Sequence, residues 1–298
     1  MRIFLTGATG FIGSAIVKEL IGAGHQVLGL ARTEEAERSL IAAGAQVHRG
    51  NLENLESLRS GAAMSDGVIH TGFIHDFSKY KENCEIDRRA IETLGEGLAG
   101  TGRPLVVTSG TAVGQTGELI TEDQQPVSGS DEMPRAASEE AAAAVAARGV
   151  RVAVVRLPLS VHGEGDHGFV PILIGLAREK GMAAYMGDGL NRWPAVHRLD
   201  AARAFRLVVE NNAAAGNFHV VGEEGIAFKD ITNIIGRRLN VPVANITASA
   251  AAGYFGWFTH FAAINNPTGS RHTRELLGWE PVQPGLLSDI DSAHYFNQ

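Results

Sequence analysis

The sequence predicts an α/β fold, with a doubly wound parallel sheet and a smaller C-terminal lobe. Short apolar strands alternate with helical stretches along the first half of the chain. The strands are almost continuous in Val, Leu and Ile, which indicates burial on both faces of a parallel sheet. With 298 residues and 44% hydrophobic residues, the chain can fill the core that such a fold needs.

The first strand, turn and helix lie at the very start of the chain. Apolar residues 2–5 lead into Thr6-Gly7-Ala8-Thr9-Gly10-Phe11-Ile12-Gly13, and the next eight residues repeat with the helical period. Gly7 permits a tight turn, Gly10 lets the backbone approach a pyrophosphate, and Gly13 lets the helix pack near the strand. We predict a dinucleotide cradle rather than a purely structural turn. Its expected contacts are Gly7, Thr9, Gly10, Phe11, Ile12 and Gly13.

The second strand, Val27–Leu30, ends close to the position that usually selects the cofactor. An acidic residue there would bind the ribose 2′-hydroxyl, but this chain has Arg32. A guanidinium can hold a 2′-phosphate with two hydrogen bonds, so we expect NADP(H) rather than NAD. The alternative is that Arg32 is a solvated residue that opens a charged helix containing Glu34 and Glu35.

The remaining strands of the sheet are expected at 46–48, 67–70, 104–108 and 151–156. Ligands of such sheets bind beyond the C-terminal ends of the strands, so the residues after each strand are candidates for the site. The Ala-rich stretch 136–147 predicts a helix that packs closely, with a homodimer contact as the second interpretation. The acidic, turn-rich loop 115–133 is expected to be a mobile flap.

After Pro158 the pattern loosens into a region rich in Gly, His and aromatic residues. A helix around 200–210 and a strand at 218–221 then return to the earlier pattern. We therefore predict a dinucleotide-binding domain formed by residues 1–160 and 196–221. The substrate-binding lobe would be formed by residues 161–195 and 222–298.

Composition excludes several classes of function. A net charge of −7 gives no basic field for nucleic acid. The single cysteine, Cys84, allows no internal disulfide and fits the reducing cytoplasm. No apolar run reaches about 18 residues and no charged leader precedes one, so membrane insertion and secretion are disfavoured. Asp166-His167 lacks a further ligand at suitable spacing, so we predict no metal site.

Seven motifs are spread along nearly the whole chain. They are the glycine run, Gly50-Asn51-Leu52, Val68–Gly72, Val107–Thr111, Val155–Pro158, Val196–Ala202 and Leu277-Gly278-Trp279. Together they resemble the extended and atypical short-chain dehydrogenase/reductase family, which includes NAD-dependent epimerase/dehydratases and dihydroflavonol-reductase-like enzymes. The resemblance implies a Rossmann fold. The further cofactor contacts that it implies are Asn51, Leu52, Thr71, Gly72, Phe73, Thr108, Leu157 and Pro158.

The proton relay of that family is absent from this chain. Family members use a Tyr-x-x-x-Lys pair with a Ser or Thr and an Asn, and the Tyr donates the proton. The four positions are occupied here by Arg135, Glu139, Gly110 and Asp87, respectively. An Arg keeps its protons above about pH 12 and is a poor acid. The departures match an atypical subgroup that resembles epimerases yet binds NADP.

Four residues are candidates for the catalytic role. Ser109 and Thr111 follow a strand and could hydrogen-bond a carbonyl or merely cap the strand end. Asp87 stands at the Asn position. Arg135 is interpreted as a surface ion pair with Glu139, four residues on, or as a binder of an acidic substrate.

Histidines and aromatic residues supply the candidate substrate contacts. His70, His75, His162 and His167 follow strands and could act near pH 7, although a single His is usually structural. Aromatic residues of the lobe, including the cluster 254–258, are more often core than pocket. If they face the cofactor, they favour an apolar or aromatic substrate over a sugar nucleotide. The chosen substrate candidates are His75, His162, Phe169, Tyr185 and Trp193.

The sequence therefore favours an NADP(H)-dependent oxidoreductase of the atypical type. It would transfer hydride to or from a small apolar or aromatic carbonyl or alcohol compound, with a non-standard proton donor. The alternative is an NADP-binding sensor or interaction protein whose catalytic residues have been lost. A sugar-nucleotide epimerase or dehydratase is the third hypothesis, and the missing Tyr counts hardest against it.

Overall fold

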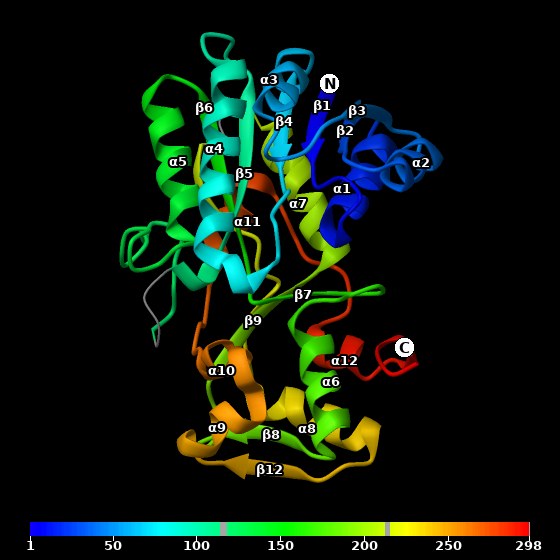
Figure 1. The fold of residues 1–298 in the computed structure, drawn as a ribbon, viewed down its shortest axis with the longest axis vertical. Coiled ribbons are helices and arrows are strands. Elements are labelled where there is room, and N and C mark those ends of the chain that lie inside the picture. Colours follow the sequence, from blue (N-terminus) through cyan, green and yellow to red (C-terminus); the bar gives the residue numbers. More distant parts are fainter. Residues whose placement is uncertain (114–117, 212–214, 298) are drawn as a thin grey trace.

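A parallel sheet of seven strands forms the centre of the larger part of the molecule (Figure 1). The computed structural model describes residues 1–113, 118–211 and 215–297. The strand order is β10-β6-β5-β4-β1-β2-β3, and every pairing is parallel. The predicted doubly wound Rossmann sheet is confirmed. Its strands are β1 (Arg2–Thr6), β2 (Gln26–Ala31), β3 (Gln46–Arg49), β4 (Gly67–His70), β5 (Pro104–Gly110), β6 (Arg151–Leu157) and β10 (Gly216–His219).

Helices cover both faces of this sheet and bury two apolar cores. One face carries α1 (Phe11–Gly22), α2 (Glu34–Ala42) and α7 (Arg198–Glu210), which contribute Ile16, Leu40 and Phe205 to the first core. The opposite face carries α3 (Leu55–Ala63), α4 (Tyr80–Leu98) and α5 (Ala136–Ala147). Burial of apolar strands between two helical layers explains their continuous Val, Leu and Ile content.

The Ala-rich helix α5 packs closely on α4 and on the sheet. A Cβ atom added to Gly95 of α4 would lie 2.4 Å from the Val145 side chain of α5, so the small residues set the spacing of the two helices. Ala141 and Ala142 are buried in the same core. The predicted close packing is thus confirmed, and the homodimer contact remains a prediction.

The smaller lobe lies below the large sheet in Figure 1 and has its own core, which contains Trp193, Phe228 and Phe258. Two small sheets belong to it: β7 (Ser160–His162), β9 (Arg192–His197) and β11 (Glu223–Ala227) form one, and β8 (Ala183–Met186) and β12 (Val243–Ile246) form the other. The helices of the lobe are α6 (Phe169–Lys180), α8 (Phe228–Leu239), α9 (Ala248–Phe255), η3 (Gly256–Phe258), α10 (Thr259–Ala263), α12 (Leu286–Ile290) and η4 (Ala293–Tyr295).

One late segment packs on the large sheet rather than in the lobe. Helix α11 (Arg271–Leu277) contacts α7 and β10, and Trp279 is fully buried in the first core. The indole of Trp279 donates a hydrogen bond to the Asp200 carbonyl (3.0 Å). The predicted division of the chain therefore needs this correction, because the apolar indole completes the core under α7.

The loop expected to be a mobile flap is anchored over much of its length. Residues 115–117 of that expectation lie outside the described residues. Beyond them, Ile120 hydrogen-bonds through its backbone to Pro267 and Gly269, and the buried Glu122 carboxylate accepts two hydrogen bonds from Thr273 (both 2.9 Å). The buried carboxylate ties the loop to the start of α11, which contradicts a flap over this stretch.

Candidate active site

The turn between β1 and α1 has the geometry that only glycine allows. Gly7 has φ = +66°, and a Cβ atom on Gly13 would lie 2.0 Å from the Gly7 carbonyl oxygen. Helix α1 begins after Gly10 with no side-chain cap and no acidic residue in its first turn. Its first N–H groups and its positive dipole end are therefore open to an anion. These residues fit the pyrophosphate of a dinucleotide.

The loops after β1 and β4 touch each other beside this turn. A Cβ atom on Gly7 would lie 2.8 Å from the Gly72 nitrogen, and the Thr71 hydroxyl donates to the Thr6 carbonyl (2.8 Å). Leu52 is also close, since a Cβ atom on Gly72 would lie 3.1 Å from it. The structure thus brings four of the predicted cofactor residues close together beside the ends of β1 and β4: Gly7, Leu52, Thr71 and Gly72.

At the end of β2, Arg32 is exposed and makes no hydrogen bond or ion pair with the residues that the structure describes. Helix α2 does not need it, because the Thr33 hydroxyl caps the helix by accepting from the Ala36 N–H (3.2 Å). Asn51 turns its side-chain oxygen inward to accept from Glu53 and Asn54 (both 2.9 Å). Arg32 is therefore a cation that remains available to a ligand.

A chain of buried hydrogen bonds leads from the glycine turn toward α4. The Gly72 N–H donates to the Thr6 hydroxyl (3.0 Å), which lies 2.8 Å from Nδ1 of His70. Nε2 of His70 lies 2.9 Å from the Asp87 carboxylate. Because the Asp87 carboxylate can only accept, we assign a ring proton to Nε2, which donates to it. His70 is therefore a linker within the fold.

Arg135 ends this chain at the position of the family's Tyr. Its Nη1 donates to Asp87 (2.8 Å) and to Ser138, and its Nη2 donates to the Thr108 carbonyl (2.9 Å). The guanidinium carbon lies 4.4 Å from the ring centre of Phe73, which is a cation–π contact. The surface ion pair with Glu139 was a wrong prediction. Arg135 precedes the first residue of α5 and reaches back to α4 instead.

The charge of Asp87 is fixed by its partners. Asp87 is 2% exposed, and burial alone would raise the pKa of its carboxyl. The Arg135 charge and the hydrogen bonds from His70 and Ser138 outweigh that effect and lower the pKa to about 2. Asp87 is therefore a carboxylate at neutral pH and cannot donate a proton.

Glu139 has a different partner from the one predicted. Both of its carboxylate oxygens accept from the fully buried Arg156 of β6 (2.9 and 2.7 Å). The same guanidinium donates to the Gln124 carbonyl (2.8 Å) of the anchored loop. In the family the position of Glu139 carries a Lys, so this chain replaces that cation with a structural ion pair.

The two hydroxyl candidates at the end of β5 differ in their surroundings. Ser109 is 3% exposed, and its Oγ makes no hydrogen bond with the described residues. Thr111 donates to the buried Asn266 side chain (2.7 Å), which reaches it from the segment before α11. The Thr111 hydroxyl is thus committed to the contact between two parts of the chain, and substrate binding by Thr111 is not supported.

Of the histidine candidates, His75 is the one that lies beside Arg135 at the surface. It is exposed and meets the edge of the Phe73 ring (5.2 Å between ring centres). Desolvation of the ring by its neighbours disfavours the charged form and lowers the pKa of His75 below its ordinary value. The Arg135 charge lowers it further. His162 is instead 1% exposed, and its Nδ1 donates to the Asp289 carboxylate (2.8 Å) in the lobe.

The three aromatic candidates of the lobe occupy different environments. Trp193 is fully buried in the lobe core, and Tyr185 lies on β8 in the distant two-stranded sheet (Figure 1). Neither residue is placed as a substrate contact beside Arg135. Trp193 is packed in the apolar core of the lobe, and Tyr185 belongs to a separate sheet, so both substrate assignments are corrected. Phe169 is half-buried and contacts Phe261 (4.7 Å between ring centres), which leads toward the surface.

Sequence reasoning missed several residues that shape this region. Ser138 and Asn266 hydrogen-bond the predicted candidates from other elements, and Phe77 and Tyr80 add rings near Phe73. Phe77 and Tyr80 follow the loop at the C-terminal end of β4, and this position after a strand could have marked them as candidates. Nothing in the sequence identified Asn266.

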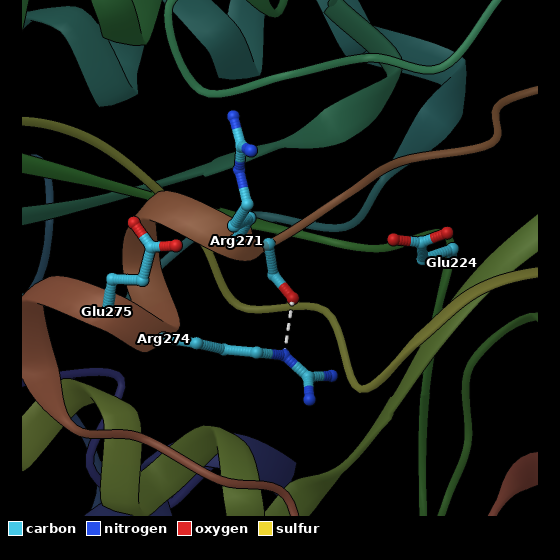
Figure 2. A pocket seen from close by; sticks show the side chains of 5 residues that line it. Glu224, Arg271, Arg274 and Glu275 are labelled. Carbon is cyan, nitrogen blue, oxygen red and sulfur yellow. Dashed lines mark hydrogen bonds between the residues drawn. The ribbon is translucent and has the colours of Figure 1, made fainter.

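A separate depression of about 550 Å³ lies at α11, away from the glycine turn (Figure 2). Arg274 points across it and donates to the Ser270 hydroxyl (3.0 Å), as Figure 2 shows. Its lining contains both acidic and basic side chains, so it offers neither an anion-binding surface for the cofactor nor an apolar surface for the substrate. The lining residues are Glu224, Ser270, Arg271, Arg274 and Glu275.

Two further kinds of feature are absent from the described residues. Across 1–113, 118–211 and 215–297, no three His, Cys, Asp or Glu side chains gather where they could hold a metal ion. In the same part of the chain, no helix combines the length and the apolar character that crossing a membrane requires.

Comparison with known proteins identifies the family. The profile of the NAD dependent epimerase/dehydratase family matches residues 3–222. The chain belongs to this family. An uncharacterized protein of Schizosaccharomyces pombe is 49% identical, over 99% of this chain and 100% of that protein.

Two more distant matches carry names that state an activity. The 2-alkyl-3-oxoalkanoate reductase of Stenotrophomonas maltophilia is 27% identical, over 85% of this chain and 80% of that protein. The solved structure of a dTDP-glucose 4,6-dehydratase from Streptomyces venezuelae, with NAD and TYD bound, has a TM-score of 0.78. It is 19% identical and covers 100% of this chain and 97% of its own, which shows the shared fold.

Proposed function

We propose that this protein is an NADP(H)-dependent oxidoreductase of the atypical type that acts on a small apolar or aromatic carbonyl or alcohol compound. The observation that carries the proposal is Arg135, a cation fixed by Asp87 at the position of the family's proton donor. It lies on the same buried chain of hydrogen bonds that begins at the glycine turn.

The cradle supports the cofactor part of the proposal. Gly7, Gly10 and Gly13 leave room for a pyrophosphate, and the uncapped start of α1 offers N–H donors to it. Arg32 supplies an unpaired cation for a 2′-phosphate. When bound, the nicotinamide supplies the hydride that is transferred.

Arg135 would act on the charge that develops on the substrate. A guanidinium carries five N–H donors, and the described contacts use those of Nη1 and one of Nη2. The side chain is 18% exposed, so it keeps a surface toward the site. It would polarise a carbonyl oxygen and stabilise the alkoxide that forms as hydride arrives at carbon. The proton that completes the alcohol would come from water.

The reductase named among the relatives supports carbonyl chemistry in this family. The dehydratase structure keeps the sugar-nucleotide hypothesis in view, but this chain lacks the Tyr that such a reaction uses as its acid. A sensor that binds NADP without turnover is the second candidate. It is favoured by the ion pair between Asp87 and Arg135, in which each charge already has a partner within the fold.

The test is turnover of NADPH with a panel of small carbonyl compounds, measured at 340 nm for the wild type, Arg135→Lys and Arg135→Met. We expect kcat to fall by about 100-fold in Arg135→Met and less in Arg135→Lys, which keeps the charge. NADPH affinity, measured by nicotinamide fluorescence, should stay within about threefold. Tight NADPH binding without turnover of any compound would support the sensor instead.

A further inference from the structure

The rings that line the approach to Arg135 assign a substrate class to the proposed site. We propose that Phe77 and Trp257 form the mouth of the substrate site and that the site takes a small planar aromatic carbonyl compound. This inference rests on the proposed function, since it concerns the substrate of that same reaction.

Ring contacts run without a break from Arg135 to the lobe. The guanidinium lies over Phe73, whose ring centre is 6.4 Å from that of Tyr80. Tyr80 meets Phe77 at 5.6 Å, and Phe77 stacks on Trp257 at 5.1 Å with an angle of 23° between the planes. The wall therefore joins the loop after β4 and the start of α4 to η3 of the lobe. Phe261 of α10 supports it by meeting Phe77 edge-on (5.8 Å).

Exposure separates this wall from the apolar core. Trp257 is 56% exposed, whereas Trp193 and Phe258, which belong to the same lobe, have no exposed surface. The rings of Phe73, Phe77 and Tyr80 are half-buried. A contiguous set of half-buried and exposed aromatic rings is costly in water and marks a binding surface more often than a structural one.

The chemistry of the wall defines what fits it. Flat ring faces bind other flat rings by stacking, which favours a planar aromatic body. The fixed cation lies at the inner end of the wall, where it would meet the carbonyl oxygen, while the ring of the substrate would lie toward Phe77 and Trp257.

The chain offers a built-in reporter for this mouth. It has three tryptophans, and two of them, Trp193 and Trp279, are fully buried. Quenching of the exposed Trp257 by an aromatic ligand will therefore report binding at the mouth. The probe is benzaldehyde added to the protein saturated with NADP⁺, in which no reduction can occur. The matched control ligand is cyclohexanecarboxaldehyde, which has a ring of similar size that is not planar.

We expect saturable quenching by benzaldehyde, with an affinity that falls about tenfold in Phe77→Leu. In turnover with NADPH, Trp257→Leu should lower kcat/KM for benzaldehyde about tenfold and change that for cyclohexanecarboxaldehyde less than threefold. Trp257→Phe should recover most of the loss, since it keeps a ring. The matched control is Leu190→Ala, which removes an exposed apolar side chain elsewhere in the lobe.

The inference fails if both aldehydes respond alike, or if Trp257→Leu and Phe77→Leu leave benzaldehyde binding unchanged. The NADPH affinity and the thermal midpoint of each variant are measured first. Only variants that match the wild type in both are compared, so that misfolding is recognised. Failure of the proposed function is distinguishable, because it appears in the wild type as absent NADPH binding or as binding without turnover of any carbonyl compound. Normal turnover without a preference for the planar ring overturns only this inference.

Discussion

Asp87 and Arg135 form an ion pair in which each charge offsets the free-energy cost of burying the other. A carboxylate that is 2% exposed would be costly without a cation, and a largely buried guanidinium would be costly without an anion. Replacing a family Asn and Tyr by Asp and Arg therefore changes two positions that act together. The charge at the candidate site is the result of both changes.

Asp87→Asn should destabilise the protein by about 3 kcal/mol at pH 7, because it leaves Arg135 without its counter-charge. The pKa of Asp87 falls to about 2 on folding. Its contribution, about 2 kcal/mol, is thus complete above the unfolded pKa near 4 and is lost as the pH falls through about 2. Urea unfolding at pH 7 and pH 3 measures both effects.

The control for this variant is Glu85→Gln on the same helix, where the carboxylate is 40% exposed and pairs with Arg88. We expect less than about 1 kcal/mol there. An equal loss in both variants would contradict the special role of the buried pair.

Arg32→Ala should weaken NADPH binding about tenfold and leave NADH binding nearly unchanged, because only NADPH carries the 2′-phosphate. Arg38→Ala is the matched control, since Arg38 is an exposed cation further along the chain, within α2. Fluorescence titration with each cofactor measures the effect. Preference for NADH in the wild type would refute the role assigned to Arg32.

At the scale of elements, the β1–α1 turn is held by backbone contact rather than by side chains. Gly13 approaches the Gly7 carbonyl so closely that no Cβ fits, and no flexible side chain can move aside to make room. The turn and the helix start are therefore one rigid unit, and the proposed binding of a pyrophosphate would depend on it.

Gly13→Ala should lower the thermal midpoint by several degrees and weaken NADPH binding more than tenfold, because its Cβ would lie 2.0 Å from a backbone oxygen. Gly22→Ala on the same helix meets nothing within 4 Å and should be neutral or slightly stabilising. Differential scanning fluorimetry with and without NADPH compares the two. Similar midpoints and affinities for both variants would argue against a tight turn.

The elements of the large sheet were predictable because their signals are local. Apolar runs such as 104–108 and the glycine turn carry their structure within a few residues. The partners of Arg135 were not predictable in this way. The i, i+4 rule pointed to Glu139, but the start of α5 is buried against α4 and β6, so tertiary packing supplied Asp87 and Arg156 instead.

At the scale of the whole molecule, the two parts are joined at the ends of their strands. Asn266 is fully buried and binds Thr111 at the end of β5 through both of its side-chain polar atoms (2.7 and 3.3 Å). Its backbone N–H donates to Arg192 at the start of β9 (2.9 Å). Asn266 therefore links the candidate site to the lobe. Its role was not predictable from the sequence because 155 residues separate it from Thr111.

Asn266→Ala should destabilise the chain by about 2 kcal/mol, because it leaves buried polar groups of Thr111 unpaired. Thr111→Val removes the hydroxyl from the other side. If the two side chains interact as described, the double variant should lose about 1 kcal/mol less than the sum of the single ones. Urea unfolding of the four proteins gives that coupling, and additive losses would contradict it.

The loop over the glycine turn depends on the far end of the chain. His167 meets the edge of the Phe11 ring (5.7 Å between ring centres), and the neighbouring Asp166 is held by the Tyr295 hydroxyl (2.9 Å). Packing around the start of α1 therefore extends, through residues 166 and 167, to Tyr295 of η4.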